Sequence, residues 1–223
     1  MEINMRIAIA GAGNVGRAIA RELLENGHQV LLIDRDPKAL KMDSVPTAEW
    51  LLADACEITS LDLAKLDGCQ VLVAATGDDK VNLVASLLAK TEYGVPRVVA
   101  RINHPKNEWL FDSSWGVDVA VSTPRIISAL VEEAVSVGDV VRLFSFRKGQ
   151  ANLVELTLPD TSSCIGKTVE EIELPDDASL AAIVRDGRVI TPTPTDVFSA
   201  GDELLFVAST TAEGLIKSCF IAG

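Results

Sequence analysis

Three glycines near the start of the chain have the spacing of a turn that holds a diphosphate. The sequence GAGNVG, residues 11–16, follows a short apolar run at 6–10 and precedes a segment with helical spacing. In such a turn the first glycine permits a tight bend, the second lets backbone amides approach phosphate, and the third lets helix and strand pack closely. The start of the helix contributes about half a positive charge. The predicted nucleotide-binding residues here are Gly11, Ala12, Gly13, Asn14, Val15, Gly16 and Arg17.

An acidic residue at the end of the next apolar run would complete such a site. Asp34 ends the run at 29–34 and follows Gly11 by 23 residues, close to the spacing at which a carboxylate binds ribose hydroxyls. It would repel a phosphate on the ribose 2′ position, although the adjacent Arg35 is a second candidate contact. The alternative is a glycine turn that only packs. We predict that a nucleotide with an unphosphorylated ribose binds here.

The elements that must position these residues form a regular alternation. Short apolar runs occur at 6–10, 29–34, 49–53, 70–76, 97–102 and 118–122, and segments with helical spacing separate them. Continuous apolar strands that alternate with helices indicate a parallel sheet covered on both faces. We therefore predict an α/β fold for residues 1–138, a Rossmann-like doubly wound parallel sheet.

Loops after the later strands should line the same crevice, because the carboxyl ends of parallel strands meet at one edge of the sheet. Asp54 and Ala55 follow the third run, and Thr76 and Gly77 follow the fourth. Arg101 lies at the carboxyl end of the fifth run, where a guanidinium suits a phosphate. We expect all five residues to contact the nucleotide.

The pattern changes after Gly138, where apolar runs lie closer together. They occur at 140–146, 151–158, 179–185 and 202–209, with one short helix expected within 165–174 and a final helix at 210–220. The pair Asp186-Gly187 is typical of a two-residue hairpin. We predict a small α+β domain at 139–223, joined to the first domain by a helix at 124–139.

Composition excludes several classes of function. The chain has a net charge of −12, which repels phosphate backbones, so we expect no nucleic-acid partner. Its four cysteines are scattered, and we expect reduced, buried thiols. No apolar run approaches the roughly 18 residues of a membrane span, and the first residues lack a secretory pattern. We therefore expect a cytoplasmic protein.

Residues for catalysis are sparse. Hydride transfer usually needs a His, Lys or Tyr beside the nicotinamide. The chain has two histidines and one tyrosine. We expect His28 to lie at the end of the sheet remote from the ligand and Tyr93 to be a packing residue, and His104 has no obvious orienting carboxylate adjacent in the sequence. We predict neither a catalytic residue nor a metal site. The alternatives are an NAD-dependent oxidoreductase of a small substrate and a redox-sensing transcriptional repressor, which would need a basic helix-turn-helix.

The segments at 5–37, 51–90, 97–107 and 115–121 resemble the TrkA-type nucleotide-binding domain (RCK N-terminal domain), and 153–209 is similar to the C-terminal domain that accompanies it. The resemblance implies a cytoplasmic regulatory subunit of a potassium uptake system, peripheral at the inner face of the membrane. It implies NAD(H) or ATP/ADP in the crevice, at Gly11 to Val15, Asp34, Asp54-Ala55, Thr76-Gly77 and Arg101. It also implies homo-oligomers, with dimers assembling into a ring that gates a membrane-embedded potassium translocating subunit.

Two features depart from the pattern of this family. Many relatives have a glutamate after the proline that follows the sixth strand, whereas this chain has Pro124-Arg125. The resemblance therefore leaves metal-assisted phosphate binding in doubt there, and Arg125 becomes a candidate phosphate contact. Some relatives also contain two tandem copies of the unit, whereas this sequence contains one.

Overall fold

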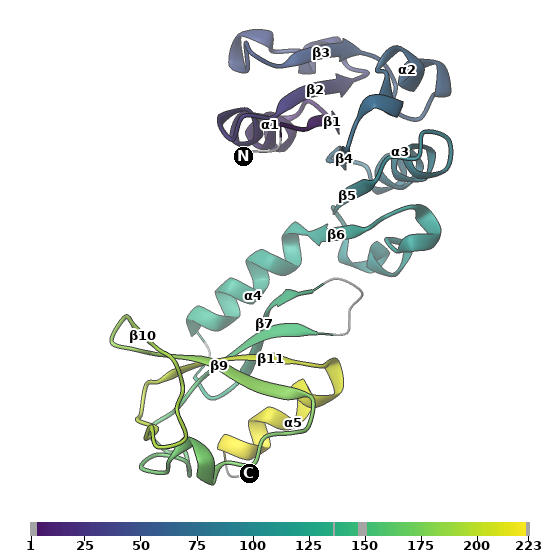
Figure 1. Cartoon of the computed structure of the whole chain (residues 1–223). Coiled ribbons are helices and arrows are strands. Elements are labelled where there is room, and N and C mark those ends of the chain that lie inside the picture. The colour runs from purple at the N-terminus through teal and green to yellow at the C-terminus, as the bar shows by residue number, and fades with distance from the viewer. Residues whose placement is uncertain (1–3, 136, 147–150, 222–223) are drawn as a thin grey trace. The chain divides into compact units, whose positions relative to one another are not determined.

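The computed structural model describes residues 4–135, 137–146 and 151–221, and the chain divides into two compact units, Met1–Pro124 and Arg125–Gly223 (Figure 1). The first unit contains a six-stranded, all-parallel sheet in the order β3-β2-β1-β4-β5-β6. Its strands are β1 Arg6–Ala10, β2 Gln29–Asp34, β3 Glu49–Leu52, β4 Val71–Ala74, β5 Arg97–Ile102 and β6 Val119–Ser122. This confirms the predicted doubly wound sheet, and each strand overlaps its predicted run.

Helices cover both faces of this sheet, as its apolar strands require. α1 (Asn14–Glu25) packs on one face, against the cluster that contains Ile7 and Ile9. α2 (Ile58–Leu63) and α3 (Asp79–Thr91) pack on the opposite face, against Ala8 and Ala10 (Figure 1). Because side chains alternate along a strand, the isoleucines of β1 face α1, and its alanines face α2 and α3 on the opposite side of the sheet.

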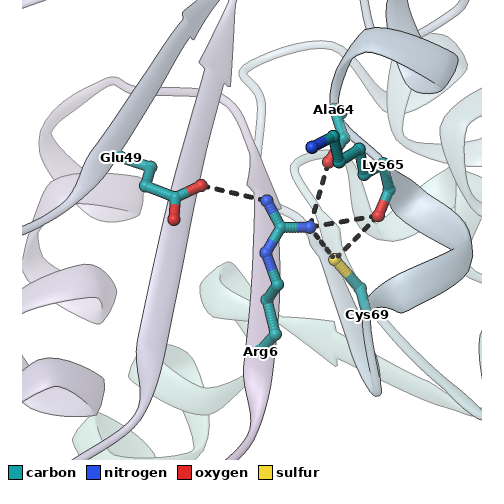
Figure 2. A network of polar contacts seen from close by, with 5 residues as sticks. All are labelled: Arg6, Glu49, Ala64, Lys65 and Cys69. Atoms are coloured by element: carbon teal, nitrogen blue, oxygen red, sulfur yellow. Dashed lines mark hydrogen bonds and ion pairs between the residues drawn. The ribbon is translucent and has the colours of Figure 1, made fainter.

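The amino end of β1 is fixed by the Arg6 side chain (Figure 2). Its guanidinium pairs with Glu49 on β3 at 2.9 Å and donates to the carbonyls of Ala64 and Lys65 at 3.1 and 3.0 Å. It also lies 3.5 Å from the Cys69 sulfur. Ala64 and Lys65 follow α2, so Arg6 donates to main-chain carbonyls at the end of this helix. One side chain therefore connects β1, β3 and α2 at the edge of the sheet where β1 begins.

The strand order reverses beside β1, because the chain moves outward through β2 and β3 and then returns to β4. The loops after β1 and β4 therefore diverge to opposite faces at the carboxyl edge of the sheet. Such a switch point opens a crevice between them.

The second unit is an antiparallel sheet with one helix packed on it. Strands β7 Val140–Ser145, β8 Asn152–Thr157, β9 Ala178–Arg185, β10 Arg188–Ile190 and β11 Glu203–Ala208 pair in the order β10-β9-β11-β8-β7. α5 (Thr210–Phe220) covers one face of this sheet (Figure 1). Phe198, Phe206 and Phe220 form an aromatic cluster in the core there. This confirms the predicted α+β domain.

Local details of the second unit mostly follow the sequence. Asp186 and Gly187 both have positive φ, 51° and 72°, as the predicted two-residue hairpin requires. The short helix expected within 165–174 is a single 3-10 turn, Val169–Glu171, in which Thr168 and Glu171 form a reciprocal cap. None of the helices in the described residues has the length and apolar character needed to cross a bilayer.

The connecting helix α4 spans Thr123–Val135 and begins where the two compact units divide, at Pro124. The domain boundary at Gly138 lies beyond the end of this helix and stays a prediction. Most of α4 thus belongs to the second compact unit.

A buried ion pair connects two segments of the second unit. The Asp202 carboxylate is fully buried and accepts hydrogen bonds from Arg185 Nε at 2.6 Å and Nη2 at 2.7 Å. It also accepts from the Ser199 amide at 2.8 Å. A buried carboxylate that loses its cation pays the cost of desolvation without compensation.

We expect Arg185→Met to lower the free energy of unfolding of the second unit by about 2 kcal/mol, because it leaves the Asp202 charge buried and unpaired. Chemical denaturation followed by circular dichroism measures this change. Arg188→Met is the control, since Arg188 is exposed on the adjacent strand β10 and lies opposite Arg185 in the register. Equal stability of the two variants would contradict this assignment.

Candidate functional site

A cavity of about 480 Å³ lies at the carboxyl edge of the parallel sheet, within the first unit. Its walls come from the turn after β1 and from the ends of β2, β3, β4 and β5. The lining residues are Gly11, Gly13, Asn14, Val15, Ile33, Asp34, Arg35, Ala53, Asp54, Ala55, Ala75, Thr76, Gly77, Asp78, Val81 and Arg101. The structure thus brings together every predicted site residue except Ala12, Gly16 and Arg17.

Two glycines of the turn have steric reasons to be glycine. Gly11 has φ of +104°, and a Cβ there would lie 2.9 Å from the Thr76 amide nitrogen. A Cβ on Gly16 would lie 1.8 Å from the Gly11 carbonyl oxygen, so α1 can approach β1 this closely only without a side chain. A Cβ on Gly13 would meet no atom within 4 Å, because this residue borders the cavity.

The start of α1 presents donors to the cavity. Gly13 is the N-cap residue and offers no side chain to the first turn of the helix. Among the described residues, the amides of Gly13, Asn14 and Val15 have no acceptor. Unpaired amides at a helix start form an anion site together with the helix dipole.

Asp34 fixes the turn from the end of β2. Its Oδ2 accepts a hydrogen bond from the Ala12 amide at 2.7 Å, and its Oδ1 accepts from the Asp36 amide at 2.9 Å. A carboxylate has about four acceptor positions, so it retains capacity for ligand hydroxyls. Asp34 therefore both supports the glycine turn and lines the cavity.

Arg17 does not point into the cavity, contrary to our expectation. Its guanidinium is buried behind the turn, where it donates to the Ala12 carbonyl and, at 2.7 Å, to Asn14 Oδ1. It also lies 3.5 Å from the Ala39 carbonyl. Carbonyls of the chain itself attract this cation, so Arg17 supports the turn and is not among the residues that line the cavity.

Arg35 and Asp54, two of the predicted nucleotide contacts, form an ion pair with each other in the structure. Arg35 Nη1 lies 3.4 Å from Asp54 Oδ2, while Asp54 Oδ1 accepts from the Cys56 amide at 2.9 Å. Burial and the Asp54 carboxylate raise the pKa of the Cys56 thiol to about 11. Arg35 is thus directed to a neighbouring carboxylate rather than left as an isolated cation.

Arg101 is the cation that faces the cavity from the opposite wall. Its Nε is buried and has no hydrogen-bond partner among the described residues. A buried donor without an acceptor is costly, and a guanidinium binds a phosphate with charge-assisted hydrogen bonds. This unpaired donor therefore favours an anion in the cavity.

Sequence reasoning missed a polar network behind the Thr76–Gly77 loop. Asp79 accepts from the amides of Asn103 and His104 at 2.6 and 3.0 Å, and from the side chains of Asn103 and Asn107 at 3.0 and 2.8 Å. Burial alone would raise the pKa of Asp79, but these hydrogen bonds outweigh it and lower the pKa. The acidic pair 78–79 was visible in the sequence, whereas its partners become neighbours only in the fold.

The cavity lining that the sequence did not indicate is apolar, with Ile33, Ala53, Ala75 and Val81. Asp78, in the loop expected at the crevice, also lines the cavity. His28, His104 and Tyr93 are not among the lining residues. Arg125 belongs to the second compact unit, outside the one that contains the cavity, and its predicted phosphate contact stays a prediction.

We expect Gly16→Ala to destabilise the first unit by about 3 kcal/mol or more, because its Cβ would overlap a backbone carbonyl. Thermal unfolding followed by circular dichroism measures the effect. Gly13→Ala is the matched control, since its Cβ meets open space and its φ of −67° is ordinary. Unfolding of both variants at the same temperature would contradict the close approach of α1 to β1.

Comparison with known proteins supports the family resemblance. The TrkA-N domain model matches residues 7–123, and the TrkA-C domain model matches residues 153–217. "Trk system potassium uptake protein TrkA" of Mycobacterium tuberculosis (strain CDC 1551 / Oshkosh) is 59% identical over 94% of this chain and 95% of that protein. "Trk system potassium uptake protein TrkA homolog" of Archaeoglobus fulgidus is 28% identical over 97% of this chain, which spans 50% of that protein.

Solved structures share the fold. The crystal structure of the GsuK RCK domain aligns with the whole chain at a TM-score of 0.64 and 16% identity, over 48% of that protein chain. The GsuK channel bound to NAD aligns with 98% of this chain at 0.66 and 16% identity, over 40% of its own length. On the strength of the two domain matches and the mycobacterial relative, the chain belongs to the TrkA family, with a TrkA-N domain followed by a TrkA-C domain.

Proposed function

We propose that this chain is the cytoplasmic regulatory subunit of a potassium uptake system and binds NAD(H) or ATP/ADP as a signal. The observation that carries the proposal is one cavity with two complementary anion-binding walls. The unpaired amides at the start of α1 form one wall, and the buried, unpaired Nε of Arg101 belongs to the other. Between them lies the Asp34 carboxylate, which suits a ribose.

The remaining lining suits the rest of a nucleotide. A cavity of about 480 Å³ is within the usual range for small-molecule sites. The amides of Gly13 to Val15 would hold phosphate, Asp34 would accept from ribose hydroxyls, and apolar residues such as Ile33 and Val81 suit a base. Arg35 is paired with Asp54, so its positive charge does not offset the negative charge of Asp34. Asp34 would therefore repel a phosphate on the ribose, which favours an unphosphorylated 2′ position.

Relatives of the same fold bind such compounds. GsuK has been solved with NAD and with ADP, and a Kef C-terminal domain of Shewanella denitrificans has been solved with AMP. These three ligands share an adenosine with a 5′ phosphate. This common chemistry is what the lining of the present cavity matches.

Binding as a signal fits the lining better than hydride transfer. Among the described residues that line the cavity, none is a His, Lys or Tyr, the side chains expected to donate or accept the proton beside a nicotinamide. Two of the three lining aspartates, Asp34 and Asp54, already accept hydrogen bonds from the chain. We therefore favour a regulatory protein over the alternative, an NAD-dependent oxidoreductase.

The partner we propose is a membrane-embedded potassium translocating subunit. The relatives are named as potassium uptake proteins, and one solved neighbour is a channel. Cytoplasmic loops of membrane proteins are rich in Lys and Arg, which complements the net charge of −12 on this chain. The same charge disfavours anionic lipid, so contact at the membrane would run through the protein partner.

An exposed apolar face on α4 supports a homo-oligomer in which dimers assemble into a ring. Ile126, Ile127, Leu130 and Val131 form one stripe of this helix, and each is more than a third exposed. An apolar stripe on a helix stabilises a protein when a partner covers it. A nucleotide can shift the equilibrium between two shapes of such an assembly only by the difference in its affinity for them, typically 1–3 kcal/mol per site. In a ring with several sites, these free-energy contributions add.

We expect Arg101→Ala to weaken binding of ATP, ADP, NAD and NADH by about tenfold or more, because it removes a charge-assisted hydrogen bond to phosphate. Isothermal titration calorimetry measures these affinities. The loss should be larger for a ligand with a terminal phosphate near Arg101.

Arg97→Ala is the control for this titration, since Arg97 is exposed at the opposite end of the same strand, β5. It should bind as the wild-type protein does. Absence of nucleotide binding by the wild type, or steady turnover of NADH with a small substrate, would overturn the proposed function.

We expect the double substitution Ile127→Glu with Leu130→Glu to shift the protein to a smaller species, because charges on the stripe oppose its burial. Sedimentation velocity measures the change. Val189→Glu is the control, since Val189 is 75% exposed on β10 and lies outside α4. Unchanged sedimentation of the α4 variant would exclude this face as the interface.

A further inference from the structure

We propose that Asn82 is a positioning residue that sets the placement of Arg101 and thereby the preference of the cavity for phosphate-bearing ligands. This inference rests on the proposed function and deepens it. Asn82 is not among the lining residues of the cavity, and its side chain is fully buried in the first turns of α3. Its contacts nevertheless reach two lining residues, Thr76 and Arg101.

The carboxamide of Asn82 uses its full hydrogen-bonding capacity on these two residues. Its Oδ1 accepts from the Thr76 amide at 2.9 Å and from the Thr76 hydroxyl at 2.7 Å. Its Nδ2 donates to the Thr76 carbonyl at 3.2 Å and to the Arg101 carbonyl at 2.9 Å. An asparagine offers two donors and two acceptor positions, so none is left for another role.

These contacts bridge the two strands where their own pairing ends. The parallel ladder between β4 and β5 ends at Ala74 and Ala100. Thr76 lies beyond this pairing, while Arg101 still pairs with Val121 of β6 on its other side. On the β4 side, the Asn82 side chain connects Thr76 to the Arg101 carbonyl. Asn103 Nδ2 also donates to the Thr76 carbonyl at 3.0 Å, so the β4 loop is held from two sides, whereas the described contacts of the Arg101 carbonyl come from Asn82.

Fixing the Arg101 main chain matters because its side chain is the unpaired cation of the site. The guanidinium Nε has no partner among the described residues, so no other group within the described chain holds that donor in place. Nε is the guanidinium nitrogen nearest the main chain and is buried, so its position depends on where the Arg101 main chain is held, and a donor that is better placed binds its ligand at a lower ordering cost. Loss of the Asn82 contact should therefore reduce binding through Arg101 and leave contacts elsewhere in the cavity unchanged.

Ser86 provides a matched comparison on the same helix. It is also fully buried, one turn beyond Asn82, and its hydroxyl donates to the Asn82 carbonyl at 2.7 Å. Ser86→Ala removes a buried hydrogen bond from α3 but touches neither Thr76 nor Arg101. A purely structural contribution of this helix would thus appear in both variants.

The test is calorimetric titration of the full chain with ADP and with adenosine, which share the nucleoside and differ in phosphate. We expect Asn82→Ala to weaken ADP binding by about tenfold, the loss of one charge-assisted hydrogen bond, and to leave adenosine binding nearly unchanged. Ser86→Ala should keep the wild-type ratio of the two affinities. Asn82→Ser, which keeps a polar group near Thr76 but is too short to reach the Arg101 carbonyl, serves if the alanine variant does not fold.

A double-mutant cycle separates positioning from general damage. If Asn82 acts through Arg101, Asn82→Ala should change the ADP-to-adenosine ratio far less in an Arg101→Ala background than in the wild type. Equal weakening of ADP and adenosine, or an undiminished effect without Arg101, would overturn the inference while leaving the proposed function intact. Failure of the wild type to bind ADP would instead overturn the proposed function and, with it, this inference.

Discussion

The close approach of α1 to β1 is the constraint on which the rest of the site depends. Gly16 lies against the carbonyl of Gly11, where any side chain would overlap the backbone. This contact directs the first amides of α1 toward the crevice that the reversal of strand order opens beside β1. Asp34 and Arg17 then support the same turn, so the amides at the start of α1 are held by backbone packing, a carboxylate and a buried guanidinium.

The opposite wall of the cavity is built on a different principle. There the first turns of α3 supply Asp79 and Asn82, buried polar side chains whose partners lie after β4, near the end of β5 and in the loop after β5. Such networks stabilise a structure only when every member is satisfied, and Asn82 meets that condition. One wall therefore depends on glycines that lack a side chain, and the other on the hydrogen-bonded side chains of Asp79 and Asn82 behind the unpaired Arg101 Nε.

Much of this fold could be predicted because apolar runs and glycine spacing are local signals. The parallel strands, the glycine turn, Asp34 and the position of Arg101 all follow from short stretches of sequence. The direction of Arg17 could not be predicted, since its partner carbonyls belong to residues 12 and 39. Asn82 was equally hidden, because Thr76 and Arg101 become its neighbours only after two strands align. The binding roles of these residues stay predictions.

The ion pair and hydrogen bonds of Arg6 have a mechanical consequence for the first unit (Figure 2). They anchor β1 at its start, while the contact between Gly11 and Gly16 anchors it at its end. A strand held at both ends cannot slide along its neighbours, and a slip of one residue would turn its apolar side chains to the wrong face. If a bound molecule shifts the main chain, the shift should therefore occur in the outer strands and their loops, while β1 keeps its position.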